Sequence, residues 1–402
     1  MQIKKETAIL GTVWLFLCCY FMQLLGFPNI LTVFLGAGLC LVLVIEQKSL
    51  CIDMRFILLA VTMLSYYGIA NGIRGMFYLI AYIPLIFYIL GNYMAYHDKD
   101  GMERSKLILV LIAAAVIGYT IHGILNSYMF FAGYKMQAKR HWFDFWKQTY
   151  MPGTQQIVFF LPALAMFAPA VIYIKQRKWV SILTALVAMF FCYTSLATRS
   201  RMSIVIFAIV FVMQIFIFIL LEGKIVKKIL SSKKAWALAA IIVVLLIGAF
   251  FVLRDTTVVG GFIYNFGKDG GILNNIRFTA QRQALSQLFT YPMGGMQMDL
   301  ILEGYCHNTW LDMANESGLI PFFAFAVYTA VTFYETVCFV RMKEISTEAK
   351  LIVAGMYISF FLLFTVEPAL EASVHLTTPW FFTNGITHGM LQLEKKKEIT
   401  NE

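Results

Sequence analysis

Long apolar runs separated by short polar segments dominate this chain of 402 residues. Most runs reach the length of about 20 residues that a helix needs to cross a bilayer. We predict about twelve spans, of which the third, eleventh and twelfth are the shortest or most polar. The twelve predicted spans lie near 7–25, 28–45, 56–70, 76–96, 107–125, 157–174, 179–197, 202–221, 235–253, 319–340, 351–366 and 376–393. The pattern predicts an all-α integral membrane protein that forms one polytopic domain over residues 1–402.

The polar segments between the runs set the expected topology. The first run follows Lys4 and Lys5 without a small-residue cleavage site after it, so we expect an uncleaved first span. Alternating the spans from a cytoplasmic N-terminus leaves both termini in the cytoplasm. Two long segments, 126–156 and 254–318, then face outward, and the second lies between the ninth and tenth spans.

Aromatic residues mark the first of these outer segments. Trp142, Trp146 and Tyr150 recur every four residues within 126–156. This spacing predicts a short helix that lies in the membrane interface as an aromatic anchor. The functional alternative is a lid or a surface on which sugars stack.

The second outer segment, 254–318, opens with several glycines. Asn274 or Asn275 is expected to cap a helix that continues to about Phe289. Tyr291-Pro292 then ends that helix, and a turn follows at Gly294-Gly295.

A second helix is expected to begin near Thr309 in the same segment, with Asp312 completing a pair similar to a capping box. This segment is the predicted chemical centre of the molecule.

Composition supports a membrane protein, since 60% of the residues are hydrophobic, 13% are charged and the mean hydropathy is +0.74. The net charge of +10 does not indicate nucleic-acid binding, because the basic residues lie mostly in short loops, as topology signals do. Of the seven cysteines, only Cys306 falls in an outer segment, so no disulfide framework is expected. Neither CxxC nor HExxH occurs, and we predict neither a metal site nor a cofactor.

The distribution of arginine changes this picture. In the predicted topology, inner segments hold 21 of the 32 basic residues, mostly lysine, whereas seven of the eleven arginines lie outside. The positive-inside rule should deplete that side of arginine, and arginine binds phosphate through a bidentate fork. We therefore predict an outward-facing anion site. The outer arginines are Arg74, Arg140, Arg199, Arg201, Arg254, Arg277 and Arg282.

A histidine accompanies these cations. His307 precedes the second helix of 254–318, and the positive end of a helix favours the neutral imidazole that a general base requires. The structural alternative is a loop histidine that only caps the helix. We predict His307 as the catalytic base, with Arg201 and Arg277 stabilising a diphosphate.

Further residues are predicted to bind substrate. They are Arg199, Arg282 and Asn308. Arg277 and Arg282 are five residues apart, which is about 140° around a helix, so Arg282 has a structural role as its alternative. Four outer carboxylates remain as candidates to orient His307 or to bind sugar hydroxyls, and the sequence does not choose among Glu303, Glu316, Glu367 and Glu371.

Three local patterns follow one another between about 195 and 330. They are Thr198-x-Ser200-Arg201, Arg277 followed by Pro292 and Gly294-Gly295, and His307-Asn308 followed after nine residues by Gly318. In their order and outer placement they resemble the motifs of the O-antigen ligase and polymerase superfamily of bacterial envelope glycan enzymes. The family pattern continues to a second glycine, where this chain has Pro321.

The resemblance implies transfer of a glycan from undecaprenyl diphosphate to an acceptor hydroxyl on the outer leaflet of the bacterial inner membrane. The expected partners are this lipid-linked donor, a sugar or glycolipid acceptor, the bilayer and a chain-length regulator, but no nucleic acid. The leading hypothesis is a surface polysaccharide polymerase. The alternative within the class is an O-antigen ligase that moves glycan to lipid A-core or another envelope acceptor.

A lipid-linked glycan flippase or transporter is the hypothesis from another class. Transporters place ionisable groups or broken helices near the membrane midplane. His122 and Glu335 are ionisable residues within the predicted spans, and both are expected near a helix end. The long outer segment with His307 also favours an enzyme.

Overall fold

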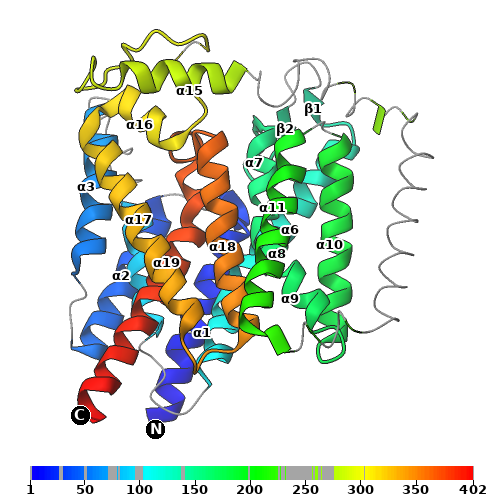
Figure 1. The fold of residues 1–402 in the computed structure, drawn as a ribbon, viewed down its shortest axis with the longest axis vertical. Helices are drawn as coiled ribbons and strands as arrows, with labels where there is room; N and C mark the ends of the chain where they lie inside the picture. Colours follow the sequence, from blue (N-terminus) through cyan, green and yellow to red (C-terminus); the bar gives the residue numbers. More distant parts are fainter. Residues whose placement is uncertain are drawn as a thin grey trace.

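In the computed structural model, the chain is a nearly all-α bundle whose helices run between two ends (Figure 1). The structure describes residues 2–26, 30–48, 52–70, 79, 82–95, 103–136, 141–197, 200–224, 227, 231, 256, 259–260, 264, 276–302 and 304–401. The predicted ninth span, 235–253, lies outside these described residues. Both termini lie at one end of the bundle, and α15, α16 and the small sheet lie at the other (Figure 1).

The elements follow one another in this order: α1 (Gln2–Phe21), η1 (Leu24–Gly26), α2 (Ile30–Gln47), α3 (Met54–Ala70), α5 (Tyr82–Ala95), α6 (Arg104–Phe131), β1 (Lys135–Met136), β2 (His141–Phe143), β3 (Tyr150–Pro152), α7 (Gly153–Val158), α8 (Leu161–Ala165), α9 (Phe167–Ile172), α10 (Lys178–Ala197), α11 (Arg201–Leu221), α15 (Ile276–Gln287), α16 (Thr309–Ser317), α17 (Leu319–Arg341), α18 (Thr347–Val366) and α19 (Ala369–Asn401).

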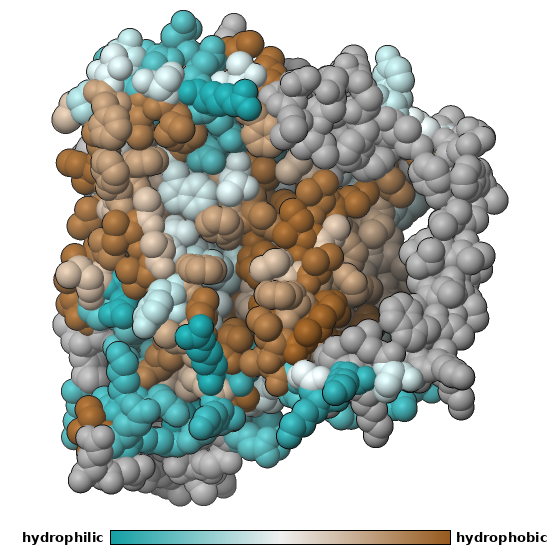
Figure 2. Space-filling model, viewed as in Figure 1, coloured by the Kyte–Doolittle hydropathy of each residue, from teal (hydrophilic) through white to brown (hydrophobic). Residues whose placement is uncertain are grey.

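Among the described residues, seven helical segments are long and apolar enough to cross a membrane. They are Ile30–Gln47, Arg104–Phe131, Gly153–Ile172, Lys178–Ala197, Met202–Leu221, Leu319–Arg341 and Thr347–Val366. Shorter apolar helices cover Thr7–Phe21, Met54–Gly68 and Tyr82–Ala95. Figure 2 shows a band of apolar side chains between two polar ends. The fold is therefore that of a multi-pass membrane protein.

The span Gly153–Ile172 is broken into the three short helices α7, α8 and α9. Pro169 has no N–H group, so the carbonyl of Ala165, four residues earlier, lacks its helical partner. Gln214 of α11 replaces that partner, because its Nε2 donates to Ala165 O at 2.6 Å and to Leu351 O at 2.9 Å. A buried glutamine thus satisfies backbone groups where a bilayer offers no water.

The predicted interfacial helix at Trp142, Trp146 and Tyr150 is wrong, because this segment forms the antiparallel sheet β1-β2-β3. Trp142 lies on β2, and Tyr150 begins β3. Between them, Asp144 Oδ1 accepts hydrogen bonds from the N–H groups of Trp146 and Lys147, at 3.0 and 2.8 Å. This turn ends regular structure locally, so the four-residue recurrence reflects a hairpin loop rather than helical turns.

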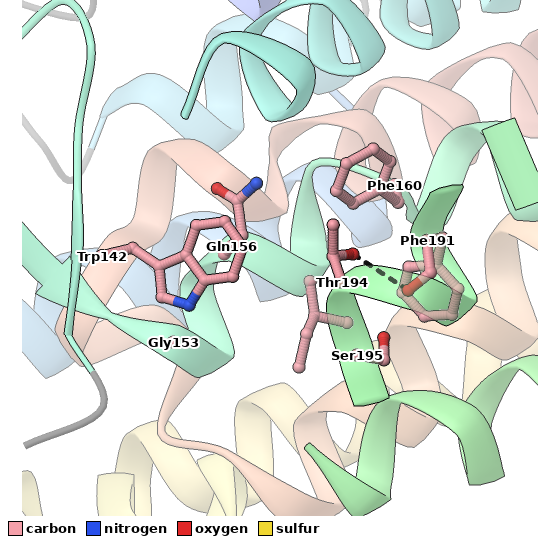
Figure 3. A pocket seen from close by; sticks show the side chains of 8 residues that line it. Trp142, Gly153, Gln156, Phe160, Phe191, Thr194 and Ser195 are labelled. Atoms are coloured by element: carbon pink, nitrogen blue, oxygen red, sulfur yellow. Dashed lines mark hydrogen bonds between the residues drawn. The ribbon is translucent and has the colours of Figure 1, made fainter. Parts of the chain in front are cut away.

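The sheet is anchored by its buried tryptophan. Trp142 is 1% exposed and stacks on Phe130 of α6, with the ring centroids 4.3 Å apart. The neighbouring cavity, lined by Trp142, Gln156 and Phe160 (Figure 3), measures about 10 Å³. That volume holds one water molecule at most, so this part of the bundle end is packed rather than open to a ligand.

Helices α5 and α19 approach each other through glycine. A Cβ atom at Gly385 would lie 2.1 Å from Tyr88 O, and one at Gly91 would lie 2.2 Å from Phe382 O. Both distances are far inside van der Waals contact, so only glycine permits this backbone approach. The contacts at Gly91 and Gly385 fix the position of α19, whose start borders the site described below.

We predict that Gly385→Ala destabilises the protein, because the added methyl group forces α5 and α19 apart at a cost of about 1–3 kcal/mol. The melting temperature of the detergent-purified protein should fall. Gly38→Ala is the matched control, since nothing lies within 4 Å of a Cβ atom at Gly38. Equal melting temperatures for both variants would contradict the close approach.

Candidate functional site

The outer segment predicted to hold the chemistry forms two helices across the end of the bundle that is opposite the termini (Figure 1). The predicted helices are confirmed, since α15 ends at Gln287 and α16 begins at Thr309. The predicted capping residues Asn274 and Asn275 lie outside the described residues.

The proline–glycine turn packs against the end of α16. A Cβ atom at Gly294 (φ +73°) would lie 2.7 Å from Glu316 O, and one at Gly318 (φ +85°) would lie 2.3 Å from Pro292 O. The N–H group of Gly295 donates to Glu316 O at 2.9 Å. The motif that follows Arg277 and the motif that follows His307 therefore hold each other in place through backbone contacts that only glycine allows.

A buried carboxylate joins the predicted catalytic residues. Arg277 Nη1 donates to Glu367 Oε1 at 2.7 Å and to Val366 O at 2.9 Å. His307 Nδ1 lies 3.5 Å from Glu367 Oε2. Burial alone would raise the pKa of Glu367, but the contacts with His307 and Arg277 outweigh it and hold that pKa below its ordinary value. Glu367 is thus an anion between two basic side chains.

Glu367 lies in the connection between α18 and α19, whereas Arg277 is on α15 and His307 precedes α16. The structure therefore brings together two of the predicted site residues, Arg277 and His307, through Glu367, one of the candidate carboxylates. The fourth candidate, Glu303, lies outside the described residues.

The backbone at His307 is held in a strained conformation. His307 has φ +54°, in the left-handed region that non-glycine residues rarely occupy. Asp312 supports the loop from both sides, because its carboxylate accepts from the N–H groups of Cys306 and Asn308, each at 2.8 Å. Asp312 thus takes part in a capping pair as predicted, but its partner is the N-cap residue Asn308. Gln281 adds a further restraint by donating to His307 O at 3.2 Å.

Gln281 is a site residue that the sequence analysis missed. It lies one turn after Arg277 on α15, so both side chains share the face toward the end of α18. Its Nε2 also donates to Thr365 O at 3.1 Å. The four-residue spacing from Arg277 was the available signal.

Cys306, next to His307, is not placed as a nucleophile. It is fully buried, and burial together with the neighbouring Asp312 raises the pKa of its thiol. A protonated thiol is a poor nucleophile.

Two of the remaining predicted residues, Asn308 and Arg282, lie on or beside the same helices. Asn308 caps α16, with Oδ1 accepting from Leu311 N at 3.1 Å, and it also lines the apolar groove described below. Arg282 is exposed and lies about 140° around α15 from Arg277. Arg201 is the first residue of α11, and Arg199 lies outside the described residues. Their roles in substrate binding stay predictions.

Two further carboxyl groups, of Glu316 and Glu371, form a buried pair beside this centre. Burial and repulsion from Glu371 raise the pKa of Glu316 to about 8. Burial also raises the pKa of Glu371, despite a hydrogen bond from Tyr305. The pair therefore keeps a proton at pH 7, and Glu371 is close enough to interact electrostatically with His307.

An apolar groove begins at the start of α16 and follows α17 and α18. Its volume is about 670 Å³, within the range of small-molecule sites. The α17 side is a stripe at helical spacing formed by Phe322, Ala326, Thr329, Ala330 and Phe333. Eleven residues of helix correspond to about 16 Å, which is the length of this stripe along α17.

No known protein family and no curated protein sequence matches this chain. Within the part of the chain that the structure describes, no group of three His, Cys, Asp or Glu side chains is arranged to hold a metal ion.

We predict that Glu316→Gln flattens the pH dependence of stability. Between pH 4.5 and about 8 the folded protein retains a proton on Glu316 that the unfolded chain has lost. The free energy of unfolding therefore falls as pH rises through this window. Glutamine mimics the protonated carboxyl, so melting temperatures measured across the window should decline less in the variant. A decline equal to that of the wild type would contradict the assignment.

Proposed function

We propose that this protein is a membrane glycosyltransferase that moves a glycan from undecaprenyl diphosphate to a sugar hydroxyl at the outer leaflet, as a surface polysaccharide polymerase. The observation that carries the proposal is the Arg277–Glu367–His307 contact beside the mouth of an apolar groove. An acid–base group, a cation and a long apolar channel are the three features that a lipid-diphosphate donor requires. The resemblance to the O-antigen ligase and polymerase superfamily supports the same chemistry.

In the proposed reaction, His307 acts as general base through Nε2, because Nδ1 faces Glu367. Glu367 is a positioning residue that fixes the imidazole and stabilises its protonated form. The acceptor oxygen bonds to the anomeric carbon, the bond from that carbon to the diphosphate oxygen breaks, and the hydroxyl proton passes to His307. This step balances without a redox partner or an additional energy source.

The charges of the site suit a diphosphate leaving group. Before the proton is transferred, the anionic Glu367 offsets the charge of Arg277. Once His307 accepts a proton, the three side chains of Arg277, Glu367 and His307 carry a net positive charge as the diphosphate departs. The start of α16 adds the partial positive charge of a helix N-terminus, and Arg201 is proposed to contribute a second guanidinium.

The groove between α17 and α18 is the proposed site of the isoprenoid chain. Asn308 at its mouth is adjacent to His307, and Trp310 and Phe361 contribute aromatic walls. An isoprenoid lying in the groove would bring its diphosphate to the polar end of the bundle, where Arg277 lies.

The proposed setting is the bacterial inner membrane, with about twelve spans, cytoplasmic termini and the site facing outward. Two ionisable groups in the predicted spans, His122 and Glu335, favour an enzyme over a flippase because both are paired. His122 pairs with Asp144 of the sheet loop at 3.1 Å, and Glu335 pairs with Arg55 near the start of α3 at 2.8 Å. Glu335 Oε1 also lies 2.7 Å from Nδ1 of His388, a third ionisable residue, which is on α19. A paired group is less suited to carry a substrate or ion across the membrane than a free one.

The test is the lipid-linked glycan profile of a deletion strain that carries plasmid-borne variants. His307→Ala should reduce transfer by about 100-fold or more, since a general base contributes that much. Arg277→Lys should also fail, because lysine keeps the charge without the fork. Arg341→Lys, at an exposed position at the far end of α17, is the control.

Each profile distinguishes the candidate functions. Single repeats that accumulate on the carrier identify a polymerase, and long polymer on the carrier identifies a ligase. A normal profile with well-expressed His307→Ala would overturn the catalytic assignment.

We also predict that filling the groove weakens donor use. Ala330→Trp places an indole in the apolar stripe and should raise the KM for the lipid-linked donor with a smaller effect on kcat. Val327→Trp is the matched control, since Val327 is 47% exposed on the same helix and does not line the groove. Equal KM values for the two variants would place the isoprenoid elsewhere.

A further inference from the structure

A second cavity, here named the Gln23 cavity, lies between the end of α1, the β2–β3 loop and the first part of α19. Its volume is about 260 Å³, slightly below the range of about 300–1,000 Å³ for small-molecule sites. Its polar lining includes Gln23, Asp144, Lys147, Gln155 and His375. None of the residues assigned above to the transfer reaction lines it.

Gln23 is the residue that points to a ligand. It is 1% exposed, and neither its Oε1 nor its Nε2 has a hydrogen-bond partner within the described residues. Its backbone has φ +52°, a conformation that costs a non-glycine residue free energy. A buried amide without partners is also costly. Strain and desolvation at one residue that lines a cavity indicate a group prepared to bind.

Lys147 provides the second polar contact. Its Nζ donates to His375 Nε2 at 3.2 Å. Because an ammonium can only donate, Nε2 of that imidazole is the acceptor and carries no proton. An ammonium has three N–H donors, so this contact leaves donors for a ligand. Burial lowers the pKa of Lys147, an effect that the nearby Asp144 partly opposes.

The charges favour an uncharged ligand. Burial would raise the pKa of Asp144, but His122 and the backbone N–H of Lys147 lower it below its ordinary value, so Asp144 is an anion. It offsets the charge of Lys147, and a free phosphate would find little net attraction. The lining combines donors and acceptors with the apolar side chains of Phe159 and Leu376, a combination that suits the hydroxyls and the C–H face of a sugar ring.

Helix α19 connects this cavity to the transfer site. Glu371 and His375 are one turn apart on the same side of the helix, about 6 Å along its axis. Glu371 belongs to the carboxyl pair that borders His307, whereas His375 lines the Gln23 cavity. A glycan bound in the cavity could therefore extend toward His307.

We propose that the Gln23 cavity binds one sugar ring of the acceptor glycan, through hydrogen bonds to Gln23 and Lys147. The assignment of that sugar to the acceptor rests on the proposed function. The binding of a sugar in the cavity does not, and it can be measured without transfer.

The experiment is saturation-transfer NMR on the full chain in nanodiscs, with galactose, rhamnose, N-acetylglucosamine and glucuronate as separate probes. At least one neutral sugar should receive saturation from the wild type. Gln23→Leu and Lys147→Met should each weaken its binding about fivefold, the equivalent of one hydrogen bond. His307→Ala should bind as the wild type does.

Gln176→Leu and Lys175→Met are matched controls, since both residues are exposed in the turn between α9 and α10. Thermal unfolding checks that each variant is folded. If Gln23→Leu or Lys147→Met is not folded, Thr149→Val replaces it, because Thr149 also lines the Gln23 cavity.

Two results would overturn the proposal. Absence of saturation for all four sugars with folded wild-type protein would mean that the cavity holds only water. Binding by Gln23→Leu and Lys147→Met equal to that of the wild type would place the sugar elsewhere. Neither result bears on His307, whereas a normal glycan profile for His307→Ala would remove the transferase and leave the sugar site standing.

Discussion

The buried carboxylate of Glu367 is the interaction on which the candidate site depends. Taking this anion out of water is unfavourable unless polar or cationic groups lie beside it. Arg277 donates to Glu367 Oε1 at 2.7 Å, and Nδ1 of His307 lies 3.5 Å from Oε2. Because the three residues come from α15, the loop before α16 and the α18–α19 connection, satisfying one charge fixes the relative positions of all three segments. The same contact leaves Nε2 of His307 directed away from Glu367, which is the arrangement that a general base requires.

The surrounding fold keeps that arrangement rigid. Asp312 and Gln281 hold the strained backbone at His307, and the glycine contacts between the proline turn and α16 fix the loop below it. The glycine-mediated approach of α5 and α19 sets where α19 starts. The site thus lies on packed helix ends, and both the apolar groove and the Gln23 cavity are lined by residues of the same or neighbouring elements.

Much of this layout could be predicted from the sequence, because long apolar runs and helix caps are local signals. The multi-pass all-α fold and the positions of α15 and α16 followed from run length, Pro292 and the capping pair at Asp312. The hairpin around Asp144 could not be predicted, because aromatic residues every four positions fit a helix equally well. Only the structure shows that the side chain of Asp144 caps the loop.

That Glu367 is a candidate carboxylate in contact with His307 and Arg277 could likewise not be predicted from the sequence. It depends on a contact across about 60–90 positions of sequence, from Glu367 to His307 and Arg277, and no local pattern encodes such a distance. The strained backbone at Gln23 could not be predicted for a different reason. A single glutamine in the sequence does not indicate a left-handed backbone conformation at a turn.

The most direct measurement uses the purified chain in nanodiscs with the lipid-linked glycan extracted from a deletion strain. The account predicts that the glycan is transferred and that undecaprenyl diphosphate is released in equal amount, with Glu367→Gln slowing both because His307 and Arg277 lose their common partner. Absence of transfer by the wild type, or a Glu367→Gln variant that is as fast as the wild type, would contradict it.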